Sequence, residues 1–160
     1  MLSALGKMRR RLSFFALRDE RGTQFVEMAL VLPILLLFFG AVAEFGRYFY
    51  IYSTLAKAAR SGARYAISRP FDTTNTNQAK SLIVFGNQSA GCAGTPVLPN
   101  MECGNVEIQK TTNADGVQVI TARIVNYEYK PILDLGKLTG ITSASLAGNV
   151  GTSVTMKYIY

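Results

Sequence analysis

An uninterrupted apolar stretch early in the chain is the feature that most limits how this protein can fold. Residues 28–43 carry no charge, and Phe25, Val26 and Phe45 extend the stretch at its two ends. A bilayer core about 30 Å thick needs roughly 20 helical residues, so residues 25–45 are long enough to span it. A soluble domain rarely exposes or buries such a stretch. The sequence therefore predicts a single-pass membrane protein.

The net charge of +7 is concentrated before the apolar stretch. Residues 1–22 hold six basic residues against two acidic ones, so the rest of the chain is only mildly basic. Basic residues that flank a membrane helix stay in the cytoplasm. We therefore expect residues 1–22 to be a basic cytoplasmic leader. The same location of charge argues against a nucleic-acid partner.

Residues 23–68 have the pattern of one long helix whose character changes along its length. Aromatic residues, typical anchors at a membrane surface, follow the apolar stretch: Phe45, Tyr48, Phe49, Tyr50 and Tyr52. Beyond Ser53 the helix is amphipathic, with a basic face formed by Lys57, Arg60 and Arg64. The opposite face is small and apolar and comprises Leu55, Ala59, Ala63, Ala66 and Ile67. Small residues let another backbone come close. This face therefore predicts packing on the chain's own sheet, a contact with another subunit, or both.

Residues 69–160 have a mixed pattern. The residue before a proline avoids the helical conformation, so Arg69 and Pro70 should end the long helix. A polar loop at 73–77 and a short helix at 78–85, ended by Gly86, are expected next. Alternation then predicts strands at 106–108, 117–129 and 153–160, with a turn at 113–116. The expected fold class is α+β, with one long helix packed on a small antiparallel sheet.

Cys92 and Cys103 both follow the apolar stretch. They are then on the oxidising side of the membrane, where an even count fits one disulfide. Two unpaired buried thiols are the alternative. A metal site is not expected, because the chain has no histidine and the cysteine spacing is too wide for a paired-ligand turn. No cofactor is predicted.

The sequence shows no pattern of catalytic residues. The chain lacks histidine, its cysteines are expected to pair, and no serine or threonine has an obvious neighbouring base. The carboxylates of residues 69–160 form no paired motif. We therefore expect a protein that is not an enzyme.

Glu27 is the most unusual single residue, because it places a carboxylate at the head of the apolar helix. Such a group costs about 2–3 kcal/mol if it lies deep in the membrane, although the dipole of a helix N-terminus offsets part of that cost. One interpretation is therefore a helix-end charge at the membrane surface. The other requires a cationic partner. If the chain is cut after Gly22, the new amine of Thr23 in one subunit can meet Glu27 of the next. An ion pair of this kind sets the axial register between stacked subunits.

Gly22, four further residues and then Glu27 resemble the processing site of type IV prepilins. The wider pattern is similar to the TadE-like family of pseudopilins of the Flp/Tad pilus. The residues that carry this resemblance are 25–33, Gly40, 44–47 and 58–66. One departure is Met28, since the family often has Phe or Tyr directly after the glutamate.

This resemblance implies a pilin-like fold and a minor pseudopilin, a structural or priming subunit of a Flp/Tad-type pilus in the bacterial inner membrane. Prepilin peptidase would cut between Gly22 and Thr23 at the cytoplasmic face. The implied partners are that peptidase, other pilins or pseudopilins, and the inner-membrane platform of the pilus. Residues 69–160 would form an extracytoplasmic domain. Whether the protein enters the filament or stays in the membrane is left open.

Two other interpretations fit the same residues. The chain can be an uncleaved single-pass adaptor or binding protein of the envelope. It can also be a secreted protein that signal peptidase cuts after Ala43, since Ala41 and Ala43 are small. Two residues of the helix have further expected roles. Pro33 should kink the helix or leave one backbone carbonyl free for a neighbour in a bundle. Glu44 should pair with Arg47 or contribute to helix–helix assembly.

Overall fold

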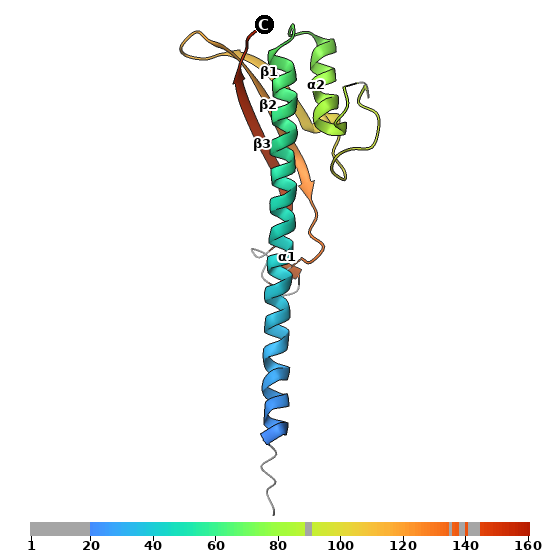
Figure 1. The fold of residues 1–160 in the computed structure, drawn as a ribbon, viewed down its shortest axis with the longest axis vertical. Coiled ribbons are helices and arrows are strands. Elements are labelled where there is room, and N and C mark those ends of the chain that lie inside the picture. The colour runs from blue at the N-terminus through green and yellow to red at the C-terminus, as the bar shows by residue number, and fades with distance from the viewer. Residues whose placement is uncertain (1–19, 89–90, 135, 138–139, 141–144) are drawn as a thin grey trace, which may run out of the picture. The chain divides into compact units, whose positions relative to one another are not determined.

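The computed structural model describes residues 20–88, 91–134, 136–137, 140 and 145–160. The basic leader expected at 1–22 therefore lies almost wholly outside the described residues. Within them the chain forms the helices α1 (Glu20–Ile67) and α2 (Thr73–Phe85), a 3-10 turn η1 (Cys103–Asn105), and the strands β1 (Val106–Thr112), β2 (Gln118–Tyr129) and β3 (Gly148–Lys157). A long apolar helix with a small antiparallel sheet confirms the α+β fold class (Figure 1).

Helix α1 contributes to two compact units, one ending at Leu37 and the other comprising Phe38–Tyr160. In the first unit the apolar side chains of α1 are exposed, and Pro33 lies inside the helix without ending it. The helix is long and apolar enough to cross a membrane. In the second unit α1 continues to Ile67, one turn of helix before Pro70. The second unit also contains α2 and the whole sheet.

Helix α2 begins earlier than the sequence pattern predicted, so the polar loop expected at 73–77 is wrong. The side chain of Asp72 accepts a hydrogen bond from the backbone N–H of Asn75 at 2.7 Å. This N-cap satisfies a donor that the first helical turn would otherwise leave free, and it starts the helix at Thr73. Gly86, with φ of 69°, ends α2 in the left-handed conformation as expected.

The three strands form one antiparallel sheet in the order β1-β2-β3. The predicted turn at 113–116 joins β1 to β2, and Gly116 has the positive φ of 73° that such a turn requires. The third strand begins before the expected Ser153 and ends at Lys157. Val154 and Met156 pack against the core, whereas Tyr160 lies beyond the strand and is exposed.

A β-bulge in β2 changes which residues face the helices. Ile120, Ala122 and Ile124 point to the buried face, as strict alternation predicts. The register with β3 then shifts between Ile124 and Tyr127, where Asn126 has a φ of 55°. An extra residue in one strand reverses the alternation that follows it. Tyr127 and Tyr129 are therefore buried on the same face as Ile120 and Ile124.

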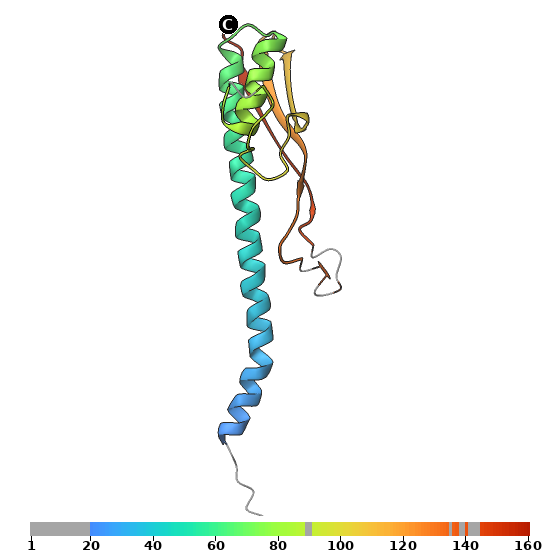
Figure 2. The same cartoon turned by 90° about the vertical axis from the view of Figure 1, so that its right-hand side faces the viewer.

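The core lies between the sheet and the two helices (Figure 2). The small apolar face of α1 is buried in it, and Leu55, Ala59 and Ala63 have no exposed surface. This is the packing within one chain that the pattern predicted. Gly62 lies so close to α2 that a Cβ added there would overlap the side chain of Ile83. The basic residues Lys57, Arg60 and Arg64 are exposed on the other face.

Candidate functional site

Glu44 is the acidic residue that the fold surrounds most completely among those described. It lies on α1 in the second compact unit and is only 4% exposed. Its carboxylate accepts a hydrogen bond from Tyr129 Oη at 2.5 Å. It also accepts from the backbone N–H groups of Ile132 at 3.2 Å and Leu133 at 3.3 Å. Arg47 Nη1 lies 3.8 Å from the same carboxylate, one turn further along the helix.

These partners explain how a carboxylate can be buried beside an apolar helix. A buried charge is tolerated only when a counter-ion and hydrogen bonds replace water, and Glu44 has both. The ring of Tyr129 is held in turn by an edge-on contact with Tyr48 at 5.3 Å and by the guanidinium of Arg47 at 5.7 Å. Burial and the hydrogen bond to Glu44 raise the pKa of Tyr129 to about 12. The tyrosine is therefore a neutral hydrogen-bond donor at physiological pH.

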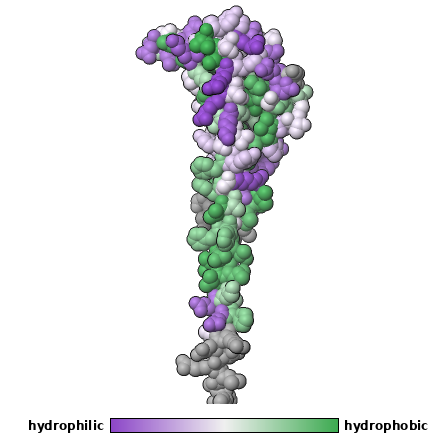
Figure 3. All heavy atoms as spheres, in the orientation of Figure 1, coloured by the Kyte–Doolittle hydropathy of each residue, from purple (hydrophilic) through white to green (hydrophobic). Residues whose placement is uncertain are grey.

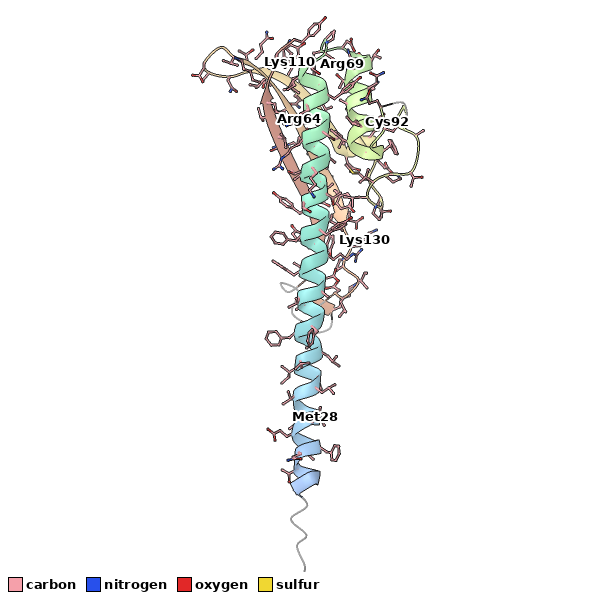
Figure 4. The ribbon with its side chains drawn as sticks, viewed as in Figure 1. Met28, Arg64, Arg69, Cys92, Lys110 and Lys130 are labelled. Carbon is pink, nitrogen blue, oxygen red and sulfur yellow. A yellow bond between two sulfur atoms is a disulfide. The ribbon has the colours of Figure 1, made fainter. Side chains whose placement is uncertain are left out.

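The Glu44 cluster fastens the segment after β2 to α1. The carboxylate holds two successive backbone N–H groups of that segment, and Arg47 donates a hydrogen bond to the carbonyl oxygen of Lys130 at 3.5 Å. Figure 4 shows Lys130 beside α1, well below the loop that carries Cys92. The expected pair between Glu44 and Arg47 is present, but it is one of several contacts. The other donors lie 85 to 89 residues away in sequence and carry no pattern that links them to α1.

The residues of the expected processing site all lie in α1. Gly22 is half-buried, whereas Thr23 and Glu27 are exposed and lie one helical turn apart. The side chain of Glu27 forms no hydrogen bond or ion pair with a described residue. A single chain therefore gives Glu27 no partner within the described residues, and its carboxylate is accessible to one from outside.

Cys92 and Cys103 are joined in a disulfide, with their Cα atoms 5.9 Å apart. The bond closes the loop that follows α2 and ties it to η1, directly before β1. Ser81 of α2, which is fully buried, accepts a hydrogen bond from the backbone N–H of Cys92 at 3.0 Å. The loop is thus attached both to the sheet and to α2.

Within the described parts of the chain, no group of three or more His, Cys, Asp or Glu residues could hold a metal ion. Several hollows on the described part of the second unit are open to the surface. One of them lies over β2 and β3 and is lined by Tyr52, Arg123, Asn126 and Thr152. None of these residues pairs a nucleophile with a base.

The comparisons with known proteins place the resemblance on α1. No curated protein and no solved structure is significantly similar to the chain. Residues 22–64 match the family model described as TadE-like protein, and this segment begins at Gly22 and lies entirely within α1. The match confirms the resemblance of this chain to the TadE-like family and indicates a protein associated with the Tad pilus.

Proposed function

We propose that this chain is a minor pseudopilin, a structural or priming subunit of a Flp/Tad-type pilus that prepilin peptidase cuts between Gly22 and Thr23. The observation that carries the proposal is the family match, which spans both Gly22 and Glu27. Helix α1 supplies the membrane anchor, and the unit formed by α2 and the sheet lies outside the cytoplasm. The protein acts by assembly and not by catalysis.

Glu27 is the assembly residue in this proposal. Cutting after Gly22 creates a positively charged amine at Thr23, and Glu27 is exposed one turn further along the helix. Four residues of helix rise about 6 Å. A neighbouring subunit displaced by that amount along the bundle axis brings its own Thr23 amine to the level of this Glu27. At any other axial offset between the two subunits the charges would be separated. A charge buried in an apolar bundle without its partner is strongly unfavourable, so the pair would fix this offset.

The burial of Glu44 bears on the secreted alternative. Signal peptidase would have to cut between Ala43 and Glu44, inside α1. That cut would remove the helical turn that precedes Glu44 and would place a new chain end at the centre of the Glu44 cluster. The anchored form keeps this cluster intact and is therefore favoured. An uncleaved adaptor would keep it too, and only the state of the N-terminus distinguishes that alternative from a pseudopilin.

The mature N-terminus tests the proposal directly. N-terminal sequencing of the protein from the membrane fraction should begin at Thr23. Gly22→Val should block cutting, since a peptidase must admit the residue before the scissile bond, and Ala43→Val should leave it unchanged. A terminus at Glu44, or an intact leader in cells with active prepilin peptidase, would refute the assignment.

A second experiment separates processing from assembly. Glu27→Ala should leave cutting at Gly22 largely intact and reduce the number of pili. Glu107→Ala is the matched control, because Glu107 is an exposed glutamate on β1. Its loss should change neither the cutting at Gly22 nor the number of pili. Normal piliation with Glu27→Ala would remove the register role and leave Glu27 as a helix-end charge, worth about 0.3–1 kcal/mol.

A further inference from the structure

The segment after β2 lies against the apolar part of α1. A Cβ added to Gly40 would be 3.7 Å from both terminal carbons of Leu133. Gly40 precedes Phe45, the end of the apolar stretch, by five residues, or about 7–8 Å of helix rise. Leu133 is therefore level with residues that the proposed span places in the bilayer. This is an ordinary van der Waals distance, so Leu133 packs directly beside Gly40.

The neighbouring Ile132 packs against little of the chain that the structure describes. It is 78% exposed, although two hydrogen bonds to Glu44 fix the backbone on either side of it. On α1 the apolar residues at this level are exposed in the same way: Phe38, Phe39, Val42 and Phe45. Figure 3 shows this hydrophobic surface of α1. Ile132 and these residues of α1 are thus exposed at the same level of the helix.

The charges around this segment are balanced locally. Lys130 pairs with Glu128 at 3.2 Å, and Lys137 pairs with Asp134 at 3.9 Å. The carboxylate of Glu44 is shielded by its hydrogen-bond donors and by Arg47. A segment without unpaired charge can enter the boundary between headgroups and acyl chains by its apolar side chains alone.

We propose that residues 131–133 insert into the bilayer leaflet on the side of the sheet, where Ile132 contacts acyl chains and forms a second membrane contact beside α1. The Glu44 cluster holds the segment at that depth and keeps the carboxylate away from lipid. The occupant is lipid because Ile132 lies at the level of α1 residues that the proposed span places in the bilayer. The inference requires that α1 spans a membrane, and not that the chain is cut or enters a pilus, so it can fail independently of the proposed function.

The absence of tryptophan from the chain provides a clean test. Ile132→Trp introduces a single fluorophore at an exposed site, and the full-length protein is placed in bilayers with or without brominated acyl chains. Ile159→Trp is the matched control, since Ile159 is also exposed, at 68%. Its backbone N–H donates to the carbonyl oxygen of Ile67, 27 residues and about 40 Å along the helix from Gly40.

The Ile132→Trp emission should be blue-shifted relative to the control and quenched by brominated lipid, and the control should not be quenched. Quenching should be equal with and without anionic lipid, because the lysines are paired. If the far-UV circular dichroism of the Trp variant is altered, Ile132→Cys carrying a small fluorophore repeats the measurement. Equal, unquenched emission from both sites would overturn the proposal, and so would a requirement for anionic lipid. A blue shift without bromine quenching that grows with the protein-to-lipid ratio would assign the surface to a second copy of the chain.

Discussion

The hydroxyl of Tyr129 donates a hydrogen bond to the carboxylate of Glu44 across 85 residues of sequence. One partner lies at the end of the apolar part of α1, and the other is the last residue of β2. This pair joins the sheet to the helix at the level where the proposed membrane ends. In the membrane contact proposed above, this pair holds the segment after β2 at its depth.

Replacing Tyr129 with phenylalanine removes the hydroxyl and leaves the ring in place. We expect the free energy of unfolding to fall by about 1.5–3 kcal/mol, since a hydrogen bond to a buried charge is lost. Urea unfolding of the full chain in detergent micelles, followed by circular dichroism, measures this. Tyr127→Phe is the control. Tyr127 is equally buried on β2, but its hydroxyl forms no hydrogen bond with a described residue. Equal losses in the two variants would show that the pair with Glu44 contributes nothing specific.

Alkaline pH should weaken the fold through the same hydroxyl. The pKa of Tyr129 is about 12 in the folded chain, above the ordinary value of 10.0. The folded state therefore favours the protonated form, and this stabilisation is complete below pH 10 and is lost as pH rises towards 12. Between pH 9 and 11 the wild-type protein should lose more stability than the Tyr129→Phe variant. Parallel pH profiles of the two proteins would contradict the assignment.

Gly62→Ala should destabilise the contact between α1 and α2. The new Cβ would overlap Ile83 Cγ1 and Cδ1 and lie 3.2 Å from the carbonyl oxygen of Ala79. Ile83 has no exposed surface, so it cannot move aside freely, and overpacking of this kind costs about 1–3 kcal/mol. Gly46→Ala on the same helix is the control. No atom lies within 4 Å of its added Cβ, so the variant should be neutral or stabilised by about 0.5–1 kcal/mol. Thermal unfolding of both variants decides the matter.

The disulfide should stabilise the second unit by roughly 3 kcal/mol in the chain-entropy model, because it closes a loop between residues 11 apart. Mass analysis of alkylated, unreduced protein from an oxidising envelope should show no free thiol. Reduction should lower the unfolding midpoint of the wild-type protein and leave a Cys92→Ser, Cys103→Ser double variant unchanged. Recovery of both thiols in the alkylated form would refute the pairing.

The sequence by itself determined the features that depend on neighbours along the chain. Sixteen uncharged residues predict the apolar helix wherever they occur, and the 3.6-residue period of Leu55, Ala59 and Ala63 predicts a buried face. Gly22 and Glu27 carry the resemblance to a pilin processing site through their spacing alone. Asp72 also had a local signal, an acidic residue ahead of a helix, and with it the start of α2 could have been placed at Thr73.

Only the tertiary structure decided what surrounds Glu44. Strict alternation along β2 places Tyr127 and Ile120 on opposite faces, and the same parity would turn Tyr129 away from the helix. The bulge between Ile124 and Tyr127 reverses that parity, and it depends on the pairing of β2 with β3, whose paired residues there are 23 to 28 positions apart in sequence. The backbone donors of Ile132 and Leu133 carry no side-chain signal at all. The partners of a buried charge are the groups that the fold brings close to it. Arg47 lies three residues from Glu44 and is visible in the local sequence, whereas Tyr129 lies 85 residues away and is not.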